Sequence, residues 1–143
     1  MTTVNIYLTF DGNCEEAFNY YKTVFGGDFE MVSRFKEMPP MDNCPEVSAE
    51  DAEKIMHITL PIGGDTVIMG NDTGGEWATN YKAGNNFSIS ISTDSQEKAD
   101  DFFAKLSKGS VVMPMDKTFW GSYFGMCVDQ FGITWMVGCE LEE

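Results

Sequence analysis

The side chains best suited to chemistry are His57 and Tyr7, which stand in two separate alternating segments. His57 is the only histidine of the chain, and it could act as a general base or donate a hydrogen bond to a substrate oxygen. Tyr7 could orient a ligand through its hydroxyl. The structural alternatives are a strand histidine satisfied by a neighbouring group and a tyrosine packed with its hydroxyl at a sheet edge, and we favour them. His57 is nevertheless the candidate catalytic residue.

A second group of candidates is aromatic or carries sulfur. Trp120, beside Gly121, is as typical of an aromatic pocket wall as of a core, and both interpretations stay open. Trp135 is expected in the core. Methionine suits an adaptable apolar lining but is also an ordinary core filler, and we favour the second interpretation. The methionines concerned are Met69, Met113, Met115 and Met136.

The cysteines offer no recognisable site. The chain has 4 of them without C-x-x-C spacing, which supports neither a zinc ribbon nor a redox motif, so we expect free thiols. Cys14 lies near a predicted helix start, where the helix dipole favours a thiolate. Three acidic neighbours oppose that charge, so a catalytic cysteine is not expected. These neighbours are Asp11, Glu15 and Glu16.

Charge and hydropathy exclude several classes of partner. Asp and Glu number 23 against 9 Lys and Arg, and the net charge of -14 repels phosphate backbones and anionic lipid surfaces. Nucleic acid and membrane are therefore not expected as partners. The first residues carry no basic leader, and no run approaches the roughly 20 apolar residues of a membrane span. We expect a cytoplasmic protein.

The elements that position these candidates can be read from periodicity in the first half of the chain. Residues 3–10 alternate, with Val4, Ile6, Leu8 and Phe10 on one side of a predicted strand. Asn13, three residues before Glu16, is the expected N-cap of a helix that ends at Gly26-Gly27. Further strands are predicted at 29–36, 54–60 and 66–70. The proline-rich segment 37–53 and the glycine-rich segment 71–84 are expected as connections.

The second half repeats this order. Residues 87–92 alternate between apolar and serine side chains, Asp94 is the expected N-cap of the next helix, and strands are predicted at 110–117, 123–129 and 133–139. A shift of 82 or 83 positions superposes the helices and first strands of the two halves. We therefore predict a tandem βαβββ repeat in a single α+β domain, with module one at about 1–80 and module two at about 81–143.

A doubled βαβββ unit resembles the vicinal-oxygen-chelate superfamily, which includes glyoxalase I, extradiol dioxygenases and bleomycin-resistance proteins. The motifs are similar to those of its PhnB-like branch and span nearly the whole chain. They are Phe10-Asp11-Gly12-Asn13-Cys14-Glu15-Glu16-Ala17, Tyr21-Lys22, Phe25-Gly26-Gly27, Lys54-Ile55-Met56-His57, Phe119-Trp120-Gly121, Asp129 with Phe131-Gly132, and Trp135-Met136. Members of this branch are often described as demethylubiquinone methyltransferases, but this sequence lacks the glycine-rich nucleotide loop that a methyl donor would need.

The resemblance implies that each module curls its strands into a cupped mixed sheet, with the helix on the convex side, a pocket in the concavity, and a homodimer. The apolar strand faces, Ile6, Leu8, Ile89 and Ile91, should then pack on the helices. A polar face turned inward needs partners, water or a ligand. For Ser88, Ser90 and Ser92, solvent exposure is an equal alternative. The residues expected to line the cup are Asn5, Tyr7, Thr9, His57, Thr59, Ser88 and Ser90.

Metal-dependent relatives carry His, Gln or Glu ligands on the first and last strand of each module. The resemblance places Met69 and Met136 at the last-strand positions, with Asn5 and either Phe87 or Ser88 at the first-strand positions. Thioethers are too soft for the hard ions of this chemistry. We therefore expect no metal and no other cofactor. A divalent metal is the minority alternative, reached through Asp72 if the register differs.

The sequence thus favours a metal-independent pocket for a small organic molecule, and it leaves turnover open. The alternatives are a divalent-metal-dependent lyase or dioxygenase and a drug-sequestering protein of the resistance type. His57 is the candidate catalytic residue. The candidate ligand-binding residues are Asn5, Tyr7, Thr9, Thr59, Met69, Ser88, Trp120 and Met136.

Overall fold

A computed structural model describes residues 2–37, 48–73 and 81–141. The predicted connections 37–53 and 71–84, and Cys44, lie partly or wholly outside these residues. The chain forms two compact units, Met1–Lys82 and Ala83–Glu143. Among the described residues, no helix has the length and apolar character that crossing a bilayer would require.

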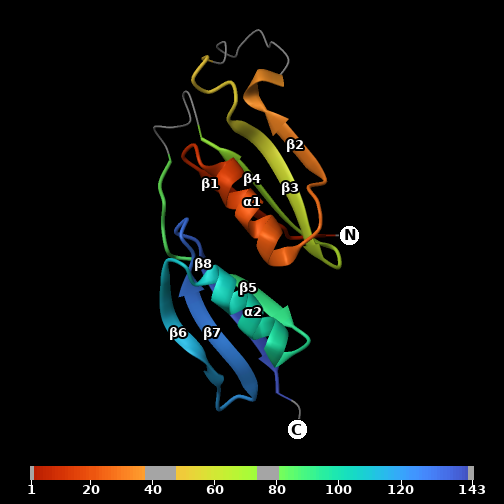
Figure 1. Ribbon diagram of the computed structural model, residues 1–143, viewed down its shortest axis with the longest axis vertical. Coiled ribbons are helices and arrows are strands. Elements are labelled where there is room, and N and C mark those ends of the chain that lie inside the picture. The colour runs from red at the N-terminus through yellow and green to blue at the C-terminus, as the bar shows by residue number, and fades with distance from the viewer. Residues whose placement is uncertain (1, 38–47, 74–80, 142–143) are drawn as a thin grey trace. The chain divides into compact units, whose positions relative to one another are not determined.

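Unit 1 is a sheet covered on one face by a helix (Figure 1). Its elements are β1 (Ile6–Phe10), α1 (Cys14–Phe25), β2 (Met31–Arg34), a 3-10 turn (Phe35–Glu37), β3 (Ile55–Gly63) and β4 (Thr66–Asp72). The strand order is β1-β4-β3-β2, with β1 parallel to β4 and the other pairs antiparallel.

Unit 2 repeats this topology. Its elements are β5 (Ile89–Thr93), α2 (Gln96–Leu106), β6 (Ser110–Lys117), β7 (Ser122–Val128) and β8 (Thr134–Glu140), in the strand order β5-β8-β7-β6. The parallel register pairs Tyr7 with Met69 in unit 1 and Ser90 with Met136 in unit 2. Met69 and Met136 therefore occupy equivalent positions, and the predicted repeat and α+β class are confirmed.

Several predicted boundaries are wrong by a few residues. Strand β1 begins at Ile6 and β5 at Ile89, so Asn5 and Ser88 lie just before the strands instead of on them. The alternating pattern continues past the point where a neighbouring strand supplies partners, and periodicity cannot detect that point. Helix α2 is capped by Ser95, whose side chain accepts from the Lys98 N–H at 3.1 Å, and not by Asp94. Adjacent Asp and Ser are both good caps.

The core of unit 1 lies between α1 and the sheet. The Phe18 ring packs edge-on against Phe10 and Tyr21, with centroids 6.2 and 5.7 Å apart. It also lies directly on the backbone of β4, because a Cβ added to Gly70 would be 2.7 Å from the Phe18 ring and 2.8 Å from the Leu8 carbonyl oxygen. A glycine is therefore required where helix and sheet approach most closely.

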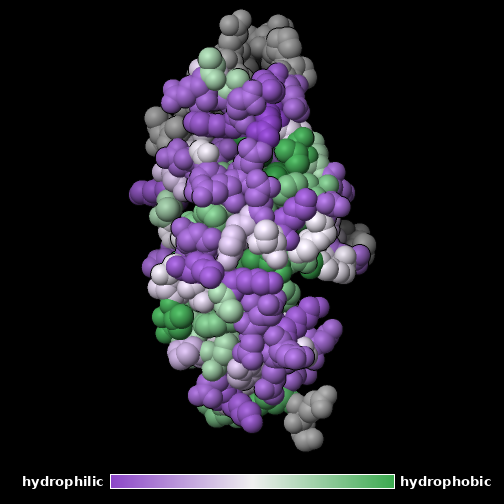
Figure 2. All heavy atoms as spheres, viewed as in Figure 1, coloured by the Kyte–Doolittle hydropathy of each residue, from purple (hydrophilic) through white to green (hydrophobic). Residues whose placement is uncertain are grey.

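The core of unit 2 is built around Trp135, which is fully buried as predicted. Its indole N–H donates to the buried carboxylate of Asp129 at 2.8 Å. The same carboxylate accepts from the backbone N–H groups of Phe131 and Ile133, so one side chain shapes the β7–β8 turn and satisfies the indole. Figure 2 shows hydrophilic side chains over the outward faces of α1 and α2, as the acidic composition requires.

Candidate functional site

The face of the unit 1 sheet turned away from α1 carries most of the polar candidates. Leu8, Ile58 and Ile68 are buried on the helix side of their strands. Their neighbours along each strand therefore point to the opposite face. One cross-strand row runs from Tyr7 through Met69 and Thr59 to Met31. We call this surface the polar face of unit 1; it consists of Tyr7, Thr9, Met31, Ser33, His57, Thr59, Met69 and Asn71.

A line of hydrogen-bonding groups crosses this face. The Tyr7 hydroxyl lies 3.5 Å from His57 Nδ1, and His57 Nε2 lies 2.8 Å from Thr59 Oγ1. In one histidine tautomer the ring accepts from Tyr7 and donates to Thr59, and in the other the directions reverse. Beside this line, Thr9 Oγ1 donates to Asn71 Oδ1 at 2.9 Å. The histidine therefore links two hydroxyl groups by hydrogen bonds, of which Tyr7 is 47% exposed and Thr59 8%.

The electrostatics keep Tyr7 protonated. Partial burial, followed by the influence of Cys14, raises the pKa of the Tyr7 hydroxyl above its ordinary value. The group is therefore a neutral O–H donor at physiological pH and not a phenolate. Burial, followed by the charges of Asp72 and Glu15, raises the pKa of the Cys14 thiol as well, so Cys14 does not supply a thiolate at this site.

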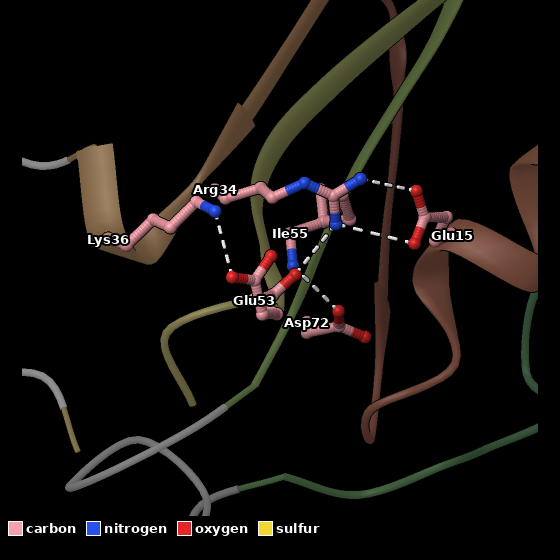
Figure 3. Close-up of polar contacts among 6 residues, drawn as sticks. All are labelled: Glu15, Arg34, Lys36, Glu53, Ile55 and Asp72. Atoms are coloured by element: carbon pink, nitrogen blue, oxygen red, sulfur yellow. Dashed lines mark hydrogen bonds and ion pairs between the residues drawn. The ribbon is translucent and has the colours of Figure 1, made fainter. Parts of the chain in front are cut away.

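Asp72 is a buried acceptor on the helix side of β4, and its suggested route to a metal is wrong. Its Oδ1 accepts from the N–H groups of Gly12 at 3.1 Å and Cys14 at 2.9 Å. Its Oδ2 accepts from Ile55 N–H at 2.9 Å, as Figure 3 shows. Asn13 is the N-cap residue of α1, as predicted, but its side chain makes no cap hydrogen bond. Asp72 thus caps α1 from a neighbouring strand and fixes the start of β3, two residues before His57.

An ion-pair network lies over the same end of β3 (Figure 3). The Arg34 guanidinium contacts both carboxylate oxygens of Glu15 and donates to the Glu53 carbonyl oxygen at 2.7 Å. Lys36 pairs with the Glu53 carboxylate at 2.8 Å. The hydrogen bond from Arg34 is the main cause that lowers the pKa of Glu15. The network links α1, β2 and the segment leading to β3, and it is partly exposed, so its contribution to stability is modest.

The corresponding face of unit 2 is apolar. A cross-strand row runs from Ser90 through Met136 and Met126 to Met113. Trp120 lies in the β6–β7 turn, 55% exposed, with its ring centroid 6.0 Å from that of Phe124. Met115 does not share this face with Met113. A Cβ added to Gly125 would meet Met115 Sδ and the Phe103 ring of α2, so Met115 lies on the helix side.

The structure divides the predicted site residues between the two units. The predicted residues of unit 1 lie together on its polar face; they are Tyr7, Thr9, His57, Thr59 and Met69. In unit 2, Trp120 and Met136 belong to the apolar surface described above. Asn71, Met126 and Phe124 were missed. They are placed on these faces by their strand partners: Asn71 pairs with Thr9, Met126 with Met136 and Phe124 with Gly138. These pairings are known only once the sheet has formed, so the sequence alone could not have identified them.

The described residues include no group of three His, Cys, Asp or Glu side chains arranged to hold a metal ion. The polar face of unit 1 instead offers hydroxyl, imidazole, amide and thioether groups. This set can donate and accept hydrogen bonds, and the imidazole of His57 can act as a base toward a bound molecule.

Comparison with known proteins places the chain in a family. The sequence model of the family described as 3-demethylubiquinone-9 3-methyltransferase matches residues 2–138. The structure is similar to protein PA1353 from Pseudomonas aeruginosa, at 36% identity and a TM-score of 0.82 over 99% of this chain and 100% of the other.

Two further solved structures share the fold. A putative 3-demethylubiquinone-9 3-methyltransferase, PhnB protein, from Bacillus cereus is 24% identical, with a TM-score of 0.72 over 99% of this chain and 100% of the other. A glyoxalase/bleomycin resistance protein/dioxygenase family enzyme from Burkholderia phytofirmans PsJN is 17% identical, with a TM-score of 0.57 over 96% of each chain. The chain therefore belongs to the family described as 3-demethylubiquinone-9 3-methyltransferase, and it shares its fold with a PhnB protein and with a glyoxalase/bleomycin resistance protein/dioxygenase family enzyme.

Proposed function

We propose that the chain binds a small, oxygen-bearing organic molecule on the polar face of unit 1 and that it does so without a metal. The observation that carries the proposal is the hydrogen-bonded line Tyr7–His57–Thr59, with distances of 3.5 and 2.8 Å. These groups cluster on one sheet face although they come from different strands. A polar sheet face of this kind is best satisfied when a ligand or water completes its hydrogen bonds.

Each residue has a distinct role in this proposal. Tyr7 donates a hydrogen bond from its hydroxyl group to a ligand oxygen. Its raised pKa keeps the hydroxyl protonated and therefore able to donate. His57 orients Tyr7 and can accept a proton from the ligand. Met69, between Tyr7 and Thr59 in the cross-strand row, supplies a soft apolar contact. Thioether chemistry at Met69 and Met136 is the reason to propose a metal-free site.

The ligand is proposed to be the principal partner of a cytoplasmic homodimer that contacts neither nucleic acid nor membrane. The net charge of -14 supports the last two points. The homodimer rests on the sequence resemblance. Size-exclusion chromatography with light scattering measures the oligomeric state directly.

A thermal-shift screen tests ligand binding. Small carboxylic acids, phenols, enols and S-adenosylmethionine are added to the full chain, since the family description names a methyl transfer. We expect stabilisation by an oxygen-bearing compound. Titration calorimetry should then show weaker binding to Tyr7→Phe and His57→Ala. The matched control is Tyr123→Phe, which removes a hydroxyl bonded to Asp100 on the helix side of unit 2. Unchanged affinity in both test variants would return Tyr7 and His57 to a structural role.

A second arm tests the metal-free part of the proposal. Protein purified without chelator is assayed for metal content and for thermal stabilisation by Ni, Zn, Fe, Mn and Mg. We expect no stoichiometric metal and no stabilisation. One ion that binds at one equivalent and raises the melting temperature would instead favour the metal-dependent lyase or dioxygenase.

A further inference from the structure

The turn between β1 and α1 contains a chemically reactive peptide step. Asp11-Gly12 is the only Asp-Gly or Asn-Gly step in the sequence. Both residues are exposed, and a Cβ added to Gly12 would meet only Lys54 Cε, at 3.8 Å. A glycine after an aspartate leaves the backbone nitrogen unshielded, because no side chain stands beside it. This step is therefore the position at which the chain is most open to isomerisation of an aspartate.

The isomerisation is intramolecular and needs no cofactor. The Gly12 nitrogen loses its proton to solvent and attacks the side-chain carboxyl carbon of Asp11. A carbon–nitrogen bond forms, and one carboxyl oxygen takes up a proton and leaves as water. Water then opens the succinimide ring, either at the side-chain carbonyl, which regenerates aspartate, or at the backbone carbonyl, which leaves Gly12 joined through the side chain as isoaspartate. One water leaves and one returns, so the mass is unchanged and nothing is oxidised or reduced.

The Asp72 carboxylate opposes this reaction at the nucleophile. Its Oδ1 accepts the hydrogen bond of the Gly12 N–H group at 3.1 Å. The electron pair that deprotonation would leave on the Gly12 nitrogen therefore points at Asp72 instead of the Asp11 carboxyl carbon. It would also face a negative carboxylate that is 2% exposed and poorly screened by water. Direction and charge both disfavour the attack.

The backbone is fixed on both sides of the step. The Phe10 carbonyl oxygen accepts from the Thr73 N–H at 2.7 Å, and Asp72 Oδ1 also accepts from the Cys14 N–H at 2.9 Å. These bonds join the end of β1 to the end of β4, its neighbour in the sheet (Figure 1). Within the described part of the chain, no hydrogen bond or ion pair holds the Asp11 side chain. The restraint thus acts on the backbone nitrogen and not on the carboxyl group that it would attack.

We propose that Asp11-Gly12 is a covalent modification site, at which isoaspartate forms when the α1 cap opens, and that Asp72 suppresses this reaction in the folded chain. Opening of the contact between Asp72 and Gly12 is a local event that releases the nitrogen without unfolding the domain. Isoaspartate adds one methylene group to the backbone before Gly12, so the Gly12 N–H loses its geometry toward Asp72 and α1 loses part of its cap. This site goes beyond the proposed function, which concerns the polar face of unit 1.

The test measures isoaspartate in the full chain during incubation at pH 7 and 37 °C with a reducing agent. Peptide mapping separates the aspartyl and isoaspartyl forms, and electron-transfer fragmentation assigns the position. A synthetic peptide of residues 5–20 gives the rate without tertiary structure. The folded chain should form isoaspartate at Asp11 about ten- to a hundredfold more slowly than the peptide, since a hydrogen bond to a charged group shifts the opening equilibrium by about this factor.

Two variants of Asp72 separate its charge from its hydrogen bond. Asp72→Asn keeps the shape of the side chain and removes its charge, and it should accelerate isoaspartate formation at Asp11 by about fivefold. Asp72→Ala removes the acceptor, and its rate should approach that of the peptide. Far-UV circular dichroism at the incubation temperature measures the folded fraction of each variant. If Asp72→Ala is not folded, the result for Asp72→Asn decides.

Gly70→Ala is the matched control. It lies on the same strand and disturbs the packing of Phe18 on the sheet, but it leaves the acceptor for Gly12 in place. Its rate at Asp11 should stay within about twofold of the wild type, because local opening of the cap is not coupled to this packing. Asp94-Ser95 is an exposed reference step in unit 2, and its rate should be the same in every variant.

Several outcomes would overturn the proposal. Equal rates in the folded chain and the peptide would show that the fold does not restrain the step. Wild-type rates in the Asp72 variants would remove the role of Asp72, and an equal acceleration in Gly70→Ala would assign the reaction to general unfolding of unit 1. Absence of isoaspartate even in the peptide would remove the modification site. None of these measurements involves a ligand, so their results are independent of whether the proposed function holds.

Discussion

Replacing Asp72 by alanine should destabilise unit 1 more than replacing any exposed acidic residue. The carboxylate is 2% exposed and accepts from the N–H groups of Gly12, Cys14 and Ile55. A hydrogen bond to a charged group contributes about 1.5–3 kcal/mol, and an unpaired buried donor costs about 1–3 kcal/mol. Gly12 is exposed, so water can replace the hydrogen bond of its N–H group. The loss of stability therefore depends mainly on the two other donors, the N–H groups of Cys14 and Ile55. We expect Asp72→Ala to lower the free energy of unfolding by about 3–5 kcal/mol.

Asp72→Asn is the sharper variant because it keeps the shape of the side chain. Its carbonyl oxygen can still accept from Gly12 and Cys14, but its amide group then presents a donor to the Ile55 N–H. We expect a loss of about 2–3 kcal/mol. Because Ile55 lies two residues before His57, the His57 side-chain resonances should also shift. The control is Asp65→Asn, at an exposed position in the β3–β4 turn, which should change stability by less than about 0.5 kcal/mol.

Urea unfolding followed by circular dichroism measures these differences, with m-values compared to verify that the transition remains the same. The loss expected for Asp72→Ala is a large part of the roughly 5–15 kcal/mol by which a folded domain is stable. If this variant is partly unfolded at 25 °C, the measurement is made at a lower temperature. The reasoning fails if Asp72→Ala lies within about 1 kcal/mol of the wild type. That result would mean that water or a rearranged Asn13 caps α1 equally well.

Three further predictions follow from packing and charge. Gly70→Ala should cost at least about 2 kcal/mol in urea unfolding, because the new methyl would meet both the Phe18 ring and the Leu8 carbonyl. Gly84→Ala should be close to neutral, because the new methyl would make only an ordinary contact with Asn86 Oδ1 at 3.9 Å. Burial, followed by the charge of Asp129, raises the pKa of Cys127 to about 11; iodoacetamide at pH 8 should therefore leave Cys127 unmodified in the folded protein and modify it in urea, and rapid native labelling in peptide mass spectra would contradict the burial. Glu15→Gln should lower stability by less than about 1 kcal/mol at pH 7, since the pair with Arg34 is partly exposed. The folded pKa of Glu15 lies below its unfolded value, so this contribution is present above the unfolded pKa and disappears as the pH falls through the folded pKa; a difference that persists at pH 2 would exclude the ion pair as its source.

The sequence alone determined the repeated architecture and the orientation of the most regular strands. Alternation in β1 separates Leu8 and Phe10 from Tyr7 and Thr9, and the buried and exposed positions follow it. In a half-buried strand, apolar and polar residues alternate because successive side chains point to opposite faces. The orientation of each side chain can therefore be predicted from its nearest neighbours in the sequence. The motifs that span the chain were sufficient to identify the family.

Irregular strands could not be read in this way. In β6 the register shifts between Val111 and Met113 and again between Met113 and Asp116, with Pro114 lacking the N–H for a ladder hydrogen bond. Met113 and Met115 therefore lie on opposite faces although their spacing predicts one face. In β3, Met56 has no partner in β2, because Ser33 pairs with His57 and Arg34 pairs with Ile55; Ile55 is buried and Met56 half-buried.

Tertiary structure alone decided which distant groups meet. The separation in sequence is 58 residues between Asp72 and Cys14 and 50 between Tyr7 and His57, and nothing local to either partner specifies the other. The same holds for the row of Met113, Met126 and Met136, which exists only after three strands pair in register. Periodicity tells which way a side chain points along its own strand, but the partner across the sheet is fixed by long-range strand pairing, and the candidate sites of this protein are made of such partners.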